Sequence, residues 1–498
     1  MRQLLSVAIV GGLSGCSLIY NPGNLPAASP HDGGVEVDAE IILDADPALL
    51  ALEGAFPATL DEGAGVDGSR PALLVLTGTQ MVPGATISVM RSGGGTTTAV
   101  VDNTKTTIAA DGKMMYAPIT IGIDGTIGPS LPTKSYKLDI IVTQAGTVTR
   151  MLPGAVTVQG YDELMGAAIP AGAHTYSQVA ISGAFTAATS TEPLVVRSNS
   201  SITIAGPLTA SAVGSTGGPG GGGGGSAGTT TATAGDGGGG AGKGLHNNGG
   251  GGYGTAGGAG SMGPSATAGD AAFKTLADNH GAGGAGGAGG VGTGGVGGGG
   301  GGTVELSARG NLTIAGIAND GAKGTAGNGG IGTTDGGSGS GGGVLLRSGN
   351  TLSATGTISV AGAAATSKGA AGGDGRVRLD APTSAASVTS TVPAYRGPMF
   401  ATSTPLVVRT KTPTLSITCQ HDAKFTYFIL DEKNNLIEPL TSPLTCGPAG
   451  TEDIDFDAKG SPLGRGVNQI CLLVDGATRT DNLPEDRNCI SLVFLYQP

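Results

Sequence analysis

A short pattern of two apolar strands recurs in the middle of the chain and constrains the fold more than any other feature. It appears as "LVVRSNSSITIAGPLTA" from Leu194, "VELSARGNLTIAGIAN" from Val304 and "VLLRSGNTLSATGTISVAG" from Val344, with a half-copy "SQVAISGAFTA" from Ser177 and a truncated copy "VRLDAP" from Val377. One copy is too small to bury its own apolar face, so the copies have to stack on one another. The repeats therefore predict a parallel β-solenoid.

A glycine-rich insert, at about 213–302, interrupts this solenoid, which we place at residues 161–402. Glycine supplies 97 of the 498 residues, far above the usual share of about 7 %. Glycine loses the most backbone entropy on ordering and has no side chain to bury, which favours a loop without fixed structure. The triplet repeat in "GGAGGAGGV" instead matches extended helices with three residues per turn, whose bare backbones would pack closely in a bundle. Both interpretations are open at this point.

β-Rich sequence flanks the solenoid on both sides. Residues 69–160 contain alternating runs such as "TISVMR" and "YKLDIIV", which predict half-buried antiparallel strands. Residues 403–498 contain comparable runs such as "KFTYFILD" and "CISLVFLY". We therefore expect an all-β protein with an immunoglobulin-like sandwich, a glycine-rich parallel β-solenoid and a C-terminal β-sandwich.

The first predicted sandwich resembles the immunoglobulin-like IPT/TIG modules of bacterial surface proteins. The resemblance lies in "LVLTGTQMVPGATISV" and, further on, "YKLDIIVTQAGTVTRMLPGAVTV". It covers this segment only, and it implies a spacer or an adhesive unit.

The N-terminus has the features of a secretory signal that ends at a cysteine. A short basic start precedes an apolar run, Leu4 to Leu13, that is too short to span a bilayer. The following "LSGC" resembles the lipobox of bacterial lipoproteins. The resemblance implies that residues 1–15 are removed as a signal peptide and that Cys16 receives diacylglycerol on its thiol and an acyl chain on its new amine. An ordinary signal peptide with an incidental cysteine, or a buried apolar segment, is the alternative.

The same resemblance gives an expected location. In Gram-negative members of the family an aspartate after the cysteine retains the protein at the inner membrane, and this chain has Ser17 instead. We therefore expect an outer-membrane lipoprotein that faces the periplasm or the cell surface. Residues 16–68 are rich in acidic side chains and show no sustained periodicity, so we expect an acidic flexible tether.

The other four cysteines lie near the C-terminus. An even set in an exported chain predicts two disulfides. A zinc site is the competing interpretation, but no pair has the C-x-x-C spacing that such sites usually have. Three connectivities are possible, and we expect Cys419 to bond with Cys446 and Cys471 with Cys489.

Several motifs resemble known sites in part, but they predict no metal, cofactor or catalytic site. "GGGGAGKG", Gly237 to Gly244, lacks the hydroxyl residue and the flanking strand and helix of a phosphate-binding loop. "GGDGRVRLD" resembles one calcium-binding nonapeptide without the tandem copies that such sites need, so we expect Asp374 to be a turn residue and Asp380 a solvated strand residue. The histidines are scattered, at His31, His174, His246, His280 and His421.

Charge and organisation lead to a functional expectation. The net charge of −11 disfavours nucleic acid as a partner. The order of lipobox, immunoglobulin-like sequence and glycine-rich repeat resembles the large glycine-rich surface lipoproteins of myxobacteria. We expect a non-catalytic structural or adhesive envelope protein, with the membrane, through its lipid, and an envelope polysaccharide or surface protein as partners. The alternative is a solenoid polysaccharide lyase or hydrolase, whose site would need acidic, basic and aromatic residues along a strand face.

Overall fold

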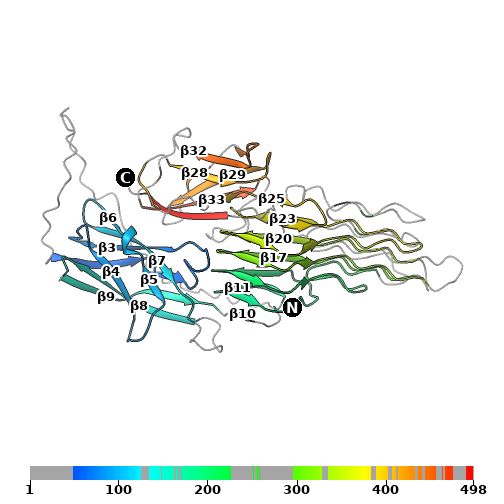
Figure 1. Cartoon of the computed structure of the whole chain (residues 1–498), viewed down its shortest axis with the longest axis horizontal. Coiled ribbons are helices and arrows are strands. Elements are labelled where there is room, and N and C mark those ends of the chain that lie inside the picture. The colour runs from blue at the N-terminus through cyan, green and yellow to red at the C-terminus, as the bar shows by residue number, and fades with distance from the viewer. Residues whose placement is uncertain are drawn as a thin grey trace, which may run out of the picture. The chain divides into compact units, whose positions relative to one another are not determined.

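The computed structural model describes residues 49–124, 134–146, 148–161, 164–165, 169, 171–225, 251, 255, 257, 295–327, 335–382, 388–401, 407–410, 413–431, 436–439, 444–455, 463, 466–474 and 490–496 (Figure 1). Their regular elements are strands, together with the short 3-10 helix η3 (Asn103–Lys105). The expected all-β fold is therefore confirmed. Among these residues no helix is long and apolar enough to cross a membrane.

The N-terminal part of the described chain is a sandwich of two sheets. One has the strand order β1-β3-β7-β5, with β6 paired to β7, and the other has the order β2-β9-β8-β4. Alternate residues turn into the core between the sheets: Leu138, Ile140 and Val142 on β8 are at most 1 % exposed. The strands are β1 (Ala51–Phe56), β2 (Thr59–Asp61), β3 (Ala72–Thr79), β4 (Thr86–Arg91), β5 (Ala99–Val101), β6 (Thr107–Ile108), β7 (Met114–Ile121), β8 (Lys134–Gln144) and β9 (Val148–Gly160).

This sandwich begins earlier than the sequence pattern indicated. Strands β1 and β2 lie inside the segment 16–68, so the prediction of a tether is wrong from Ala51 onward. Leu52 and Ala55 pack on the sandwich core while Glu53 is exposed. The alternation was obscured because a bulge at Leu52 and Gly54 shifts the register with β3. The part of the tether before residue 49 lies outside the described residues.

The predicted solenoid is present as three parallel sheets. Their strand orders are β11-β14-β17-β20-β23-β25, β10-β12-β15-β18-β21 and β13-β16-β19-β22-β24, and the coils stack one above another, from green to yellow, in Figure 1. The strands are β10 (Leu164–Met165), β11 (Gly172–Tyr176), β12 (Val179–Ile181), β13 (Phe185–Thr186), β14 (Leu194–Ser198), β15 (Ile202–Ile204), β16 (Leu208–Thr209), β17 (Thr303–Ala308), β18 (Leu312–Ile314), β19 (Ile317–Ala318), β20 (Gly343–Ser348), β21 (Leu352–Ala354), β22 (Thr357–Ser359), β23 (Arg376–Asp380), β24 (Thr389–Ser390) and β25 (Tyr395–Arg396).

The sequence repeats stack in register. Leu194 is aligned with Val304, Val304 with Val344, and Val344 with Val377. These residues belong to one buried cluster that runs through the coils. Because aligned residues of parallel strands point to the same face, each repeat adds one layer to the apolar interior.

Three glycine-rich extensions leave the solenoid after the last strand of a coil and return before the first strand of the next. We name them arm 1 (217–225 and 295–302), arm 2 (319–327 and 335–342) and arm 3 (360–366 and 369–375). Their halves run as long extended segments away from the strands of the coils (Figure 1). They are joined by backbone hydrogen bonds within an arm, such as Gly300 N to Gly222 O at 2.9 Å, and between arms, such as Gly298 N to Gly337 O at 2.9 Å.

The arms pack with a period of three residues. Gly336 faces Val296, Gly339 faces Gly299, and Gly342 faces Gly302, each so closely that an added Cβ would overlap the facing carbonyl oxygen. This is the spacing of an extended helix with three residues per turn. Of the two structures considered for the insert, its described ends therefore support the bundle. Residues 226–250 and 258–294 lie outside the described residues.

The C-terminal part is a second sandwich, as expected. Its sheets have the orders β26-β28-β32 and β27-β34-β33-β29-β30, with β31 paired to β29. Phe425, Tyr427 and Ile429 of β29 are at most 2 % exposed and lie in its core. The strands are β26 (Met399–Phe400), β27 (Val407–Val408), β28 (Thr414–Thr418), β29 (Lys424–Asp431), β30 (Leu436–Pro439), β31 (Leu444–Thr445), β32 (Thr451–Asp455), β33 (Gly466–Val474) and β34 (Ile490–Tyr496).

Candidate functional site

The predicted cysteine pair is observed in the C-terminal sandwich. Cys419, after β28, is bonded to Cys446, with the Cα atoms 6.1 Å apart, and both residues are buried. Cys471 on β33 is fully buried and is also disulfide-bonded. Its predicted partner Cys489 and the predicted lipidation site Cys16 lie outside the described residues.

Acidic residues of the supposed tether hold the first sandwich against the solenoid. We name Asp61–Arg70 the docking loop. The Glu62 carboxylate, 1 % exposed, accepts a 2.8 Å hydrogen bond from the Ser177 hydroxyl. Asp61 forms a 2.8 Å ion pair with Arg309. Because Ser177 and Arg309 belong to turns of the solenoid, these contacts join two parts of the chain that are far apart in sequence.

Asp67 is the other acidic anchor of the docking loop. Its Oδ2 accepts hydrogen bonds from Gln178 Nε2 at 2.7 Å and Ser201 Oγ at 2.8 Å, and its backbone carbonyl accepts from Asn311 N at 3.0 Å. Gln178, Ser201 and Asn311 belong to successive coils. Three coils therefore donate hydrogen bonds to Asp67, two to its carboxylate and one to its backbone carbonyl. The acidic composition that suggested a solvated tether serves as a fixed contact surface.

The first sandwich also contacts the C-terminal part. The Arg70 guanidinium donates a 3.0 Å hydrogen bond to the Ala401 carbonyl, and burial lowers the pKa of this arginine. Val75 and Tyr116 form a small apolar cluster with Leu495 of β34. The described sandwiches and solenoid are therefore linked by polar and apolar contacts.

Charged side chains line the outer face of the β11-β14-β17-β20-β23-β25 sheet, opposite its apolar interior. We name this set the charged ladder. Arg197 pairs with Glu305 at 3.4 Å, and Asp380 pairs with Arg347 at 3.3 Å and with Arg378 at 2.7 Å. The Arg378 side chain is 2 % exposed and that of Asp380 is fully buried. The prediction that Asp380 is a solvated residue is therefore wrong, because the register places Arg347 directly beside it.

The charged ladder has the acidic and basic residues of a solenoid enzyme site, but its carboxylates are not accessible. A general acid or base has to reach the proton that it transfers, while Glu305 is 1 % exposed and Asp380 carries two guanidinium partners. Buried pairs of this kind are strongly destabilising to break. The arrangement is suited to holding adjacent coils together.

Asp335 links arms 2 and 3. Its carboxylate accepts hydrogen bonds from the Ser367 hydroxyl at 2.6 Å, the Lys368 amide at 3.0 Å and the Gly327 amide at 3.0 Å. These donors, that of Ser367 above all, lower the pKa of Asp335 to about 2. An ionised carboxylate here fastens the outer parts of two arms.

Other predicted motif residues are not assembled into a site. Asp374 lies in the extended return half of arm 3, not in a turn, and accepts a 3.1 Å hydrogen bond from Gly362 N. His174 is on β11, and His421 pairs with Asp422 at 2.9 Å. Among the residues that the structure describes, no group of three potential metal ligands occurs. The segment Gly237–Gly244 and His31, His246 and His280 lie outside them.

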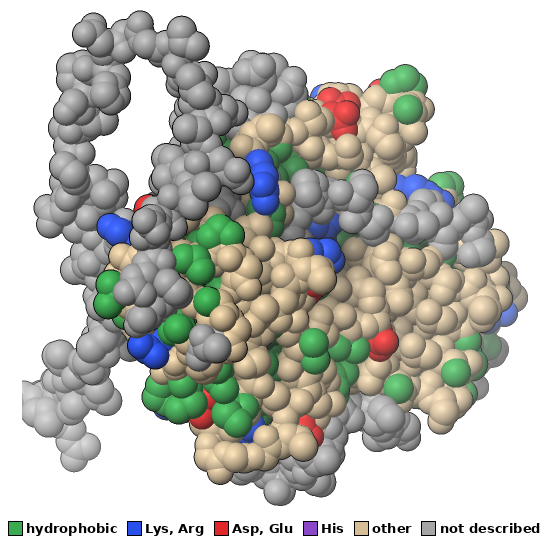
Figure 2. Space-filling model, turned by 60° about the vertical axis from the view of Figure 1, so that its left-hand side comes forward, with side chains coloured by type: hydrophobic (Ala, Val, Ile, Leu, Met, Phe, Trp, Pro, Cys, Tyr) green, Lys and Arg blue, Asp and Glu red, His purple; other side chains and the backbone are tan. Residues whose placement is uncertain are grey.

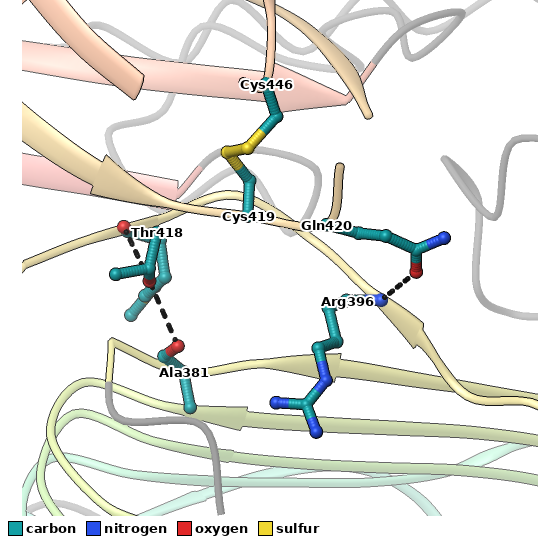
Figure 3. Close-up of a disulfide and its surroundings, with 7 residues drawn as sticks. Ala381, Arg396, Thr418, Cys419, Gln420 and Cys446 are labelled. Atoms are coloured by element: carbon teal, nitrogen blue, oxygen red, sulfur yellow. Dashed lines mark hydrogen bonds between the residues drawn. A yellow bond between two sulfur atoms is a disulfide. The ribbon is translucent and has the colours of Figure 1, made fainter. Parts of the chain in front are cut away.

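A cavity of about 150 Å³ lies where the last coil meets the C-terminal sandwich. Two residues that line it are joined directly: the Thr418 hydroxyl donates to the Ala381 carbonyl at 3.2 Å, and Figure 3 shows this contact near the Cys419–Cys446 bond. The wall is largely apolar and carries one charged side chain, that of Arg396. The lining residues are Leu352, Leu379, Ala381, Pro382, Arg396, Gly397, Thr418, Cys419 and Gly450.

In the described part of the face that Figure 2 shows, backbone and uncharged side chains outside the hydrophobic class cover most of the surface, and charged side chains are scattered. Comparisons of the chain with protein-family models, curated proteins and solved structures gave no match.

Proposed function

We propose that the chain is a lipid-anchored protein of the cell envelope that serves as a structural or adhesive surface component without catalytic activity. The observation that supports this proposal most is that carboxylates of the described residues bind other parts of the same chain. Glu62, Asp61, Asp67 and the carboxylates of the charged ladder bind other parts of the same chain. The backbone donors of the arms bind neighbouring arms in the same way. A protein built like this presents a stiff, polar, glycine-rich surface.

The proposed location at the outer membrane is based on the "LSGC" sequence. A diacylated and N-acylated Cys16 would hold the mature chain on a membrane, because each buried methylene contributes about 0.8 kcal/mol, and Ser17 favours the outer membrane. To test this, wild type, Cys16→Ala and Ser17→Asp are expressed in a Gram-negative host that is fed a clickable fatty acid, which labels lipidated protein. Wild type should be labelled in the outer membrane, Cys16→Ala unlabelled, and Ser17→Asp labelled at the inner membrane. A labelled Cys16→Ala protein in the wild-type fraction would refute the anchor.

The adhesive role is tested by presenting the purified mature protein with a panel of envelope polysaccharides. Binding without any change in polymer length is the expected result. Shortening of a polymer that is lost in Glu305→Gln or Asp380→Asn, with folding intact, would establish the alternative, a glycan-processing solenoid enzyme, and overturn this proposal.

A further inference from the structure

An arginine occupies an interior position at the last coil of the solenoid. In the column of aligned residues, Val196 is followed by Leu306, Leu346 and Leu379, and the next residue is Arg396. The first four belong to the buried apolar cluster of the coils. Since aligned residues of parallel strands point to the same face, the Arg396 side chain is directed toward the apolar interior, and Figure 3 shows it pointing from β25 to the solenoid.

The backbone of this arginine is fixed, while its guanidinium has no partner among the residues that the structure describes. Arg396 N donates to Gln420 Oε1 at 3.2 Å, and Gln420 N donates to Arg396 O at 3.2 Å. The neighbouring strand differs, because Arg378 is neutralised there by Asp380. A partly buried cation beside leucine, alanine and proline side chains loses hydration without a compensating hydrogen bond.

We propose that the cavity beside Arg396 binds the carboxylate of a small organic acid or of one terminal acidic group on a larger molecule. A guanidinium presents paired N–H donors that match the two oxygens of a carboxylate. The cavity volume of about 150 Å³ exceeds the space needed for one water molecule and is below the usual 300 to 1,000 Å³ of larger ligand sites. The apolar wall formed by Leu352, Leu379 and Pro382 would contact a short carbon stem.

The charge of the whole molecule limits the ligand further. At a net charge of −11 the protein repels polyanions over long range, so a single carboxylate is favoured over a highly charged chain. Two sources have this chemistry, a uronic acid unit of a glycan and the C-terminus of a peptide. The site does not depend on the lipid anchor, so its test is separate from that of the proposed function.

The mature protein is titrated with propionate and, separately, with its neutral counterpart propionamide, and calorimetry measures the binding. Propionate should bind and propionamide should not. Arg396→Gln should weaken propionate binding at least about tenfold, as expected for loss of a charged hydrogen bond, and Arg396→Lys should weaken it less because the cation remains. Lys368→Gln, which removes an exposed cation between the two halves of arm 3, is the matched control and should bind as wild type does.

Two further ligands distinguish the source of the carboxylate. They are glucuronate, with glucose as its uncharged control, and N-acetylglycine, with its amide as the uncharged control. Tighter binding of glucuronate assigns the site to a glycan, and tighter binding of N-acetylglycine to a peptide end. Thermal unfolding shows whether Arg396→Gln is folded, and Arg396→Lys serves as the test variant if it is not. Absence of propionate binding to wild type, or equal binding by Arg396→Gln or by propionamide, would overturn the proposal.

Discussion

Replacing Gly339 by alanine tests whether the arms form a close-packed bundle. Gly339 lies in the return half of arm 2, where an added Cβ would come well under 3.0 Å from the Gly299 carbonyl oxygen of arm 1. A clash with backbone cannot be relieved by a change of rotamer. The arms therefore have to separate locally.

The expected loss follows from the contacts at this position. Overpacking of this kind costs about 1–3 kcal/mol. Separation of arms 1 and 2 also strains two hydrogen bonds between them, Gly301 N to Ser340 O at 2.8 Å and Gly298 N to Gly337 O at 2.9 Å, each with a net contribution of about 1 kcal/mol. Reduced entropy of the unfolded chain returns about 0.4–1 kcal/mol. The free energy of local opening should thus fall by about 2–4 kcal/mol, or roughly thirty- to a thousandfold in the opening equilibrium.

Amide hydrogen exchange followed by mass spectrometry measures this opening. In wild type, 217–225, 295–302 and 335–342 should exchange slowly, and Gly339→Ala should accelerate exchange in 295–302 and 335–342. Gly183→Ala is the matched control, because an added Cβ there has nothing within 4 Å. Fast exchange throughout the wild-type arms, or the same exchange in Gly339→Ala as in Gly183→Ala, would refute the bundle.

Three other changes test separate parts of the fold. Hydrogen bonds hold the pKa of Asp335 at about 2 instead of 3.8, so its stabilisation is present above pH 3.8 and is lost as the pH falls toward 2. Asp335→Asn should remove this acid-dependent increase in exchange at the arm ends, and an unchanged pH profile would contradict it. Asp380→Asn leaves Arg347 and Arg378 without their counter-charge and should reduce the free energy of unfolding in urea by about 3–5 kcal/mol; a loss below about 1 kcal/mol would argue against a buried pair. Asp67→Ala removes the acceptor of two hydrogen bonds and should increase protease cleavage in the docking loop, whereas the exposed Asp111→Ala should not.

The stacking of the coils could be predicted because the repeats carry it in local sequence. Leu194, Val304 and Val344 start equivalent runs, and the structure aligns them without a shift. The charged ladder was visible in the same alignment, since Arg197 and Arg347 occupy the same place in their repeats. It was missed because the alignment places Asp380 beside Arg347 but does not show that the Asp380 side chain is buried there.

The docking loop and arms 2 and 3 could not be recognised from local pattern. Glu62 and Asp67 are acidic residues near glycine, which is typical of a solvated linker, and their partners Ser177 and Ser201 lie more than a hundred positions away. In the arms the three-residue spacing is present in the sequence. Glycine has no apolar side chain, however, so the sequence does not show which face of an arm is buried. What orders the arms is hydrogen bonding between distant backbones.

The dependence of the arms on the coils sets an order of stability. Few side chains in the arms are large enough to bury much apolar area, so backbone hydrogen bonds must offset the ordering entropy of about 1–2 kcal/mol per residue. Those bonds form only if both ends of each arm are held at the correct separation, and the ends are held by strands such as β19 and β20, whose residues pack in the solenoid core. The coils do not need the arms in return: β13 and β14 are joined by residues 187–193 without an arm and still stack in register with the next coil. The arms should therefore order after the coils have formed, and they should open before the coils do.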